Sequence, residues 1–94
     1  MLFVASHKHP VAQCPLENPQ GKAMIKQLFT DENVKKAEIK IVGAYVSCPR
    51  EIGSEHKGFF TVEADTAAAV VKFFGPMTVE VRPVVPFSEV AKTM

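Results

Sequence analysis

The sequence predicts one α+β domain, in which a four-stranded antiparallel sheet carries two helices on one face. Three observations predict it. The 94 residues suffice for a single domain spanning residues 1–94. Hydrophobic patterns with periods of two and of 3.6 alternate along the chain as strand, helix, strand, strand, helix, strand. The stretch GFFTVEADTAAAVVKFF, residues 58–74, then joins a strand to a helix with only a sharp turn between them.

The first strand is predicted at Leu2–His7, with apolar residues on both faces, so we expect a central strand that is covered on both sides. The segment His7–Glu17 contains two prolines and no usable periodicity, which predicts a loop. Asn18 and Pro19 are an N-cap and a first helical residue. The apolar stripe of this first helix is Met24, Ile25, Leu28 and Phe29.

A second cap at Thr30 predicts a short helix that runs to Lys36, with acidic residues in its first turn. The second strand is expected at Glu38–Val46. Its apolar parity shifts at Gly43, which indicates a β-bulge. Residues 48–55 then form a connection.

The third strand precedes Asp65 or Thr66, either of which can cap the helix that ends at Gly75-Pro76. The last strand is expected at Met77–Arg82, where apolar and polar residues alternate. The two prolines that follow prevent further central pairing. Residues 88–94 form a tail of at most one helical turn.

The resulting order, β-α-β-β-α-β, is the ferredoxin-like arrangement, for which connection rules give the strand order 4-1-3-2. The side chains expected to face the helices are Ile39, Ile41, Phe60, Val62, Met77, Val79 and Val81. The other face is expected to carry Phe3, Ala5, Val46 and Phe59, with a rim of Thr61, Glu63, Thr78, Glu80 and Arg82. An apolar centre with a polar rim predicts a homodimer joined sheet to sheet.

Two runs, FFTVEADTAAAVVKFF and VEVRPVVP, resemble the third strand with its helix and the last strand with its exchange tail in the dimeric α/β-barrel superfamily. The run HPVAQCP from His9 to Pro15, with Tyr45 and His56 downstream, is similar to short bacterial and archaeal members. The superfamily includes cofactor-free monooxygenases, isomerases, cyclases and haem-degrading enzymes, so the resemblance does not fix an activity. It implies a cavity between sheet and helices that often contains one or two histidines.

Composition excludes several classes of partner. A net charge of +1, with basic and acidic residues interspersed, gives no reason to expect nucleic acid. No apolar run approaches the roughly 20 residues that span a bilayer, and the N-terminus lacks the basic start of a signal peptide. Two cysteines without an export signal predict a cytoplasmic protein with free thiols. A Cys14–Cys48 disulfide is disfavoured for the same reason.

All histidines and cysteines of the chain fall in loops or at strand ends: His7, His9, Cys14, Cys48 and His56. Imidazole and thiolate favour zinc or copper, although neither His-x-His-x4-Cys nor Cys-x7-His is an established zinc spacing. Strands one and three are expected to lie parallel and adjacent, which places His9 and His56 roughly 20 Å apart. The residues then form two half-sites, unless the loop after residue 8 folds back or a second subunit contributes.

The first hypothesis is a small-ligand or transition-metal-binding protein that uses His9, Cys14 and His56, with His7 and Cys48 in reserve. The second is an enzyme without a cofactor, in which Tyr45 lines the cavity with His9 or His56 as acid or base. Cys14 as a nucleophile would need a lowered pKa. The third is a non-catalytic dimeric binding module.

Overall fold

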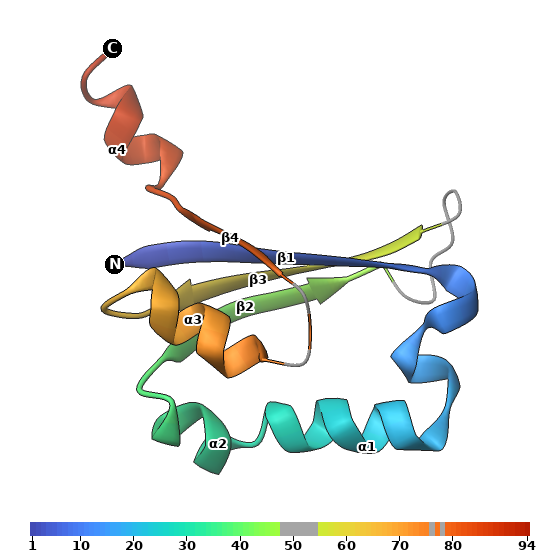
Figure 1. The fold of residues 1–94 in the computed structure, drawn as a ribbon. Coiled ribbons are helices and arrows are strands. Elements are labelled where there is room, and N and C mark those ends of the chain that lie inside the picture. The colour runs from blue at the N-terminus through green and yellow to red at the C-terminus, as the bar shows by residue number, and fades with distance from the viewer. Residues whose placement is uncertain (48–54, 76, 78) are drawn as a thin grey trace.

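The computed structural model describes residues 1–47, 55–75, 77 and 79–94. Its strands are β1 (Leu2–Pro10), β2 (Lys40–Val46), β3 (Glu55–Glu63) and β4 (Glu80–Pro83). Its α-helices are α1 (Pro19–Leu28), α2 (Asp31–Lys36), α3 (Ala67–Phe74) and α4 (Phe87–Ala91), and two 3-10 turns, η1 (Val11–Gln13) and η2 (Pro15–Glu17), follow β1. The chain is therefore an α+β fold with an open four-stranded antiparallel sheet (Figure 1).

The strands lie in the order β2-β3-β1-β4, which reads 4-1-3-2 when it is counted from the other edge. Every pair of neighbours is antiparallel. The expectation that the first and third strands run parallel is wrong. In a β-α-β-β order the hairpin reverses the direction of the third strand, so the end of β1 meets the beginning of β3.

The helices α1, α2 and α3 lie on one side of the sheet (Figure 1). The expected caps are confirmed: the side chains of Asn18, Thr30 and Thr66 accept hydrogen bonds from the backbone N–H groups of Gly21, Asn33 and Ala69. Gly75 ends α3 with a φ of 22°, in the region that favours glycine. These capping groups fix the helix beginnings and the end of α3. Val70, Phe73 and Phe74 of α3 are buried, whereas Met24, expected in the apolar stripe of α1, is exposed.

The core lies between the sheet and the helices. The strand residues expected to face the helices are buried there or packed against the buried cluster, and Phe29, Phe73 and Phe74 cover them. Phe3 and Ala5, which were expected on the opposite face, are also buried in this core. The reason is register: Phe3 pairs with Val62, and Ala5 with Phe60, so each pair shares the helix-covered face.

Several strand boundaries differ from those expected. Residues 7–10 continue β1 rather than starting a loop, because they pair with residues 55–58 at the beginning of β3. The last strand begins at Glu80 instead of Met77. The register shift between Ile41 and Gly43 confirms the bulge in β2.

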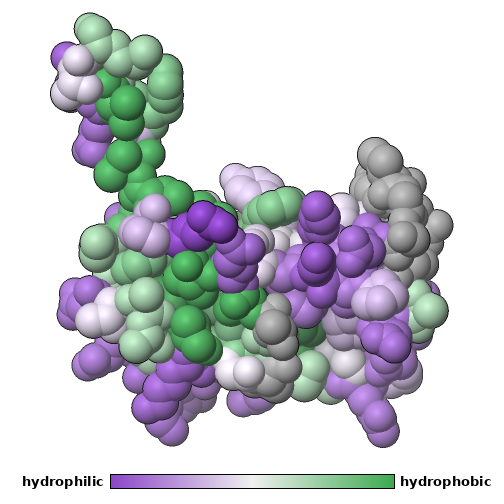
Figure 2. Space-filling view, turned by 45° about the horizontal axis from the view of Figure 1, so that its top comes forward, coloured by the Kyte–Doolittle hydropathy of each residue, from purple (hydrophilic) through white to green (hydrophobic). Residues whose placement is uncertain are grey.

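No helix in the described part of the chain covers the other face of the sheet, and the C-terminal arm, residues 84–94 with α4, extends away from the body (Figure 1). Phe59, expected on this face, is there and is half exposed, whereas Val46 lies on the helix side. On the arm, Phe87 is 72% exposed. Hydrophobic surface runs from the arm onto the body (Figure 2). The expectations for Cys48, the connection 48–54, Pro76 and Thr78 lie outside the described residues.

No helix in the described part of the chain has the length and hydrophobicity needed to cross a membrane.

Candidate metal centre

The centre begins with two histidines that face each other across neighbouring strands. His9 on β1 is the direct partner of His56 on β3. Side chains alternate between the faces of a strand, so Phe3, Ala5, His7 and His9 all face the helices. The rings of His9 and His56 meet edge to face, with centroids 5.3 Å apart and planes at 88°.

Cys14 reaches the same place because the chain turns immediately after β1. It precedes η2, and its carbonyl accepts a hydrogen bond from the Glu17 N–H at 3.0 Å. The helix α1 packs closely on this turn: a Cβ at Gly21 would lie 2.1 Å from the carbonyl oxygen of Pro15. Only glycine permits that approach, so Gly21 helps to hold the turn that carries Cys14.

His9, Cys14 and His56 form one cluster. One ligand atom from each of them lies within 4.8 Å of the others. Cys14 is a free thiol that is 2% exposed. His56 is fully buried, and neither of its ring nitrogens has a hydrogen-bond partner among the described residues. Burying unpartnered polar atoms costs about 1–3 kcal/mol, so this arrangement needs an explanation that packing alone does not supply.

The electrostatic surroundings favour neutral imidazole at His9. Burial, together with the neighbouring rings of His7 and His56, lowers the pKa of His9 below its usual value of 6.5. Desolvation disfavours the charged form, and nearby imidazolium groups would repel it. Neutral imidazole is the form that binds a metal ion.

The donor set, two imidazole nitrogens and one sulfur, suits zinc or copper. In a tetrahedral zinc site with Zn–S near 2.3 Å and Zn–N near 2.0–2.1 Å, the ligand atoms are roughly 3.3–3.6 Å apart. The spread of up to 4.8 Å exceeds this by roughly 1 Å, a movement that rotation of the side chains can supply. Three protein ligands leave a fourth position open, which is typical of catalytic or exchangeable sites.

The structure joins three of the five residues singled out as soft ligands, and the expected distance of roughly 20 Å between His9 and His56 is wrong. His7 neighbours His9, with ring centroids 5.3 Å apart, but it is not one of the three clustered residues. Cys48 lies outside the described residues. Tyr45, expected to line the cavity, is 69% exposed on the opposite face, where it pairs with Phe59.

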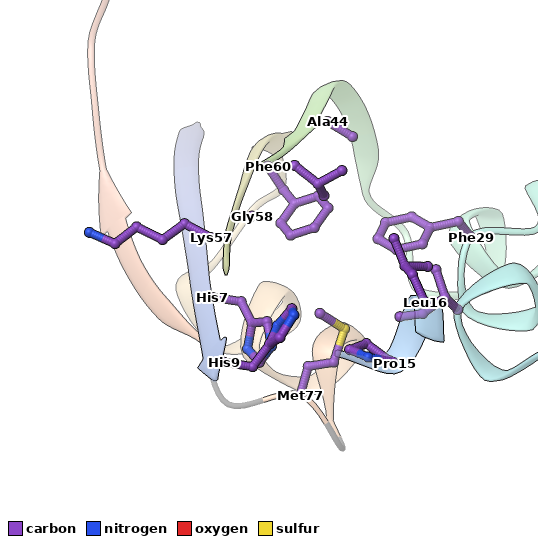
Figure 3. A pocket seen from close by; sticks show the side chains of 12 residues that line it. His7, His9, Pro15, Leu16, Phe29, Ala44, Lys57, Gly58, Phe60 and Met77 are labelled. Carbon is purple, nitrogen blue, oxygen red and sulfur yellow. The ribbon is translucent and has the colours of Figure 1, made fainter. Parts of the chain in front are cut away.

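Beside the cluster is an apolar pocket of about 260 Å³ between α1 and the strands β2 and β3 (Figure 3). His7 and His9 stand at one end of it, and Phe29 and Phe60 contribute aromatic walls. Its other lining residues are Pro15, Leu16, Ile25, Ala44, Val46, Lys57, Gly58 and Met77. Most of these were not identified as functional from the sequence. Extending the alternation Phe3, Ala5 to His7 and His9 would have indicated where the pocket begins.

Comparisons with family models, with curated proteins and with solved structures found no match to this chain.

Proposed function

We propose that this protein binds a transition-metal ion, zinc or copper, through His9, Cys14 and His56. One observation carries the proposal: the fully buried imidazole of His56 has two unpartnered nitrogens in the described structure and lies beside two further soft donors. A metal ion would satisfy His56 and use the thiol of Cys14. It would also compensate for the desolvation of three polar groups at once.

Elemental analysis of protein purified without a histidine tag tests the proposal. We expect about one zinc or copper per chain, and its loss in the Cys14→Ala variant. His7→Ala is the matched control, because it removes a neighbouring imidazole but leaves the three ligands, and it should retain the metal. Metal-free protein that takes up neither ion when it is added, while folded, would contradict the proposal.

We also propose that the chain adopts the ferredoxin-like fold of the dimeric α/β-barrel superfamily and pairs as a homodimer. The chain order β1-α1-β2-β3-α3-β4, the uncovered sheet face with Phe59 and Tyr45, and the exposed apolar arm support this. Sedimentation equilibrium should give twice the chain mass. Phe59→Glu should shift the population to monomer, whereas Lys36→Glu on α2 should not. A wild-type protein that remains monomeric at high concentration would contradict the dimer.

A further inference from the structure

The apolar pocket has polar groups at one end only. Its walls are aliphatic or aromatic, and the Lys57 side chain extends away from the cavity (Figure 3). In the described lining, the polar side chains that remain are therefore His7 and His9. Among the residues that the structure describes, no aspartate or glutamate lines the pocket, so nothing in the described lining repels an anion.

The pocket and the proposed metal centre share His9. Pro15, which follows Cys14, also lines the pocket, whereas Cys14 and His56 are enclosed in the protein interior. An ion held by the three residues would consequently have protein on the side of Cys14 and His56. Its fourth position would then lie beside His9, on the side of the cavity.

From this juxtaposition we propose that the pocket binds a small aromatic anion, whose anionic oxygen or sulfur occupies the fourth position of the metal ion. This inference rests on the proposed function. The metal ion supplies the charge complementarity, and the described lining residues include no carboxylate that would oppose it. The volume of about 260 Å³ lies below the roughly 300–1,000 Å³ of sites for drug-sized ligands, so the ligand is limited to about one substituted ring.

The aromatic character of the ligand follows from the wall opposite the histidines. The rings of Phe29 and Phe60 stack with centroids 5.4 Å apart and planes at 22°. Beside His9, Met77 contributes a thioether, a group that contacts aromatic rings favourably (Figure 3). Aromatic rings gain additional stabilisation from offset or edge contacts with other rings. An aliphatic anion of the same size would lack these ring contacts.

Cobalt(II)-loaded protein provides the test, because its visible absorption reports both loading and the exchange of the fourth ligand. Benzoate is the probe, and acetate, which carries the same carboxylate without a ring, is the control. We expect benzoate to change the spectrum with a Kd at least about tenfold lower than that of acetate, since burial of one ring exceeds the free energy of a tenfold change. Metal-free protein should bind benzoate at least about tenfold more weakly.

Ala44→Phe should fill the pocket from the exposed edge strand β2 and remove the preference for benzoate while leaving the cobalt spectrum intact. Val42→Phe adds the same ring to the same strand at a position that does not line the pocket, and should retain the preference. A normal cobalt spectrum with equal affinities for benzoate and acetate, or an undiminished preference in Ala44→Phe, overturns this inference alone. Failure to take up cobalt overturns the proposed function and this inference with it.

Discussion

The two ends of the β1–β3 pair bury their side chains in opposite ways. At one end, Phe3 and Ala5 pair with Val62 and Phe60, and packed phenylalanine rings cover them. At the other end, the same face carries His9 opposite His56. The first end is explained by apolar burial, which stabilises the fold without further partners. The second buries the two ring nitrogens of His56, for which the described residues supply no hydrogen-bond partner, so it resembles a binding site more than a core.

The largest effect is expected at the apolar end. Phe74 is fully buried and contacts the rings of Phe29, Phe60 and Phe73. Replacing it by alanine in Phe74→Ala should lower the free energy of unfolding by about 3–5 kcal/mol, measured by urea denaturation. Val71→Ala on the exposed side of α3 is the control and should change it by less than about 0.5 kcal/mol. Similar losses in the two variants would contradict the assigned core.

Gly21→Ala tests whether the packing of α1 positions the turn that carries Cys14. Because the added Cβ meets the backbone of Pro15, the turn that carries Cys14 must move. We expect a loss of about 1–3 kcal/mol in stability and a metal affinity about 10–100-fold weaker, as for other supporting contacts.

Ala23→Gly, on the exposed side of the same helix, controls for general destabilisation. It should cost about 1 kcal/mol while leaving the metal affinity unchanged. Equal affinities in Gly21→Ala and the wild type would show that the turn does not position Cys14.

At the polar end, His56→Leu should abolish metal binding without lowering the stability of the metal-free protein. In metal-free protein, leucine removes two unpartnered nitrogens from a buried site, so the free energy of unfolding should stay the same or rise by about 1 kcal/mol. Metal binding should be lost. His7→Leu, at a partly exposed position outside the cluster, should retain the metal. If His56→Leu instead destabilises the metal-free protein by more than about 2 kcal/mol, the ring of His56 makes stabilising hydrogen bonds, which would contradict its assignment as an unsatisfied buried group.

The smallest effect is a pH dependence of the metal-free protein. The pKa of His9 is lower in the folded chain than its usual value of 6.5, so the unfolded chain takes up the proton first as pH falls. Stability should therefore be full above about pH 6.5 and decline from there down through the folded pKa. Urea titrations from pH 7.5 to pH 5 measure this decline, which should be shallower in His9→Gln. An unchanged slope in that variant would contradict the role of His9.

Local signals in the sequence predicted much of the fold. Asn18, Thr30 and Thr66 were recognised as caps because a polar residue before an apolar stripe has a direct physical role at a helix beginning. The bulge at Gly43 was recognisable because the alternation of apolar and polar residues shifts by one position there. The sequence did not show which face of β1 is buried, because apolar residues occupy both alternating positions of this strand. Only the register with β3 shows that Phe3 and Ala5 face the helices.

The candidate site depended on the direction of one strand. His9, Cys14 and His56 were singled out by residue type, but a parallel arrangement separated the histidines along the sheet. Antiparallel pairing brings them together, and the turn after Pro10 adds Cys14. The close approach of Gly21 to Pro15 could not be predicted, since it depends on how α1 docks and not on any local pattern.

X-ray absorption at the metal edge of the zinc- or copper-loaded protein tests the central claim most directly. For zinc, the account predicts one sulfur near 2.3 Å and two imidazole nitrogens near 2.0–2.1 Å in the first shell, with the sulfur absent in Cys14→Ala. A first shell of nitrogen and oxygen alone in the wild-type protein would contradict it.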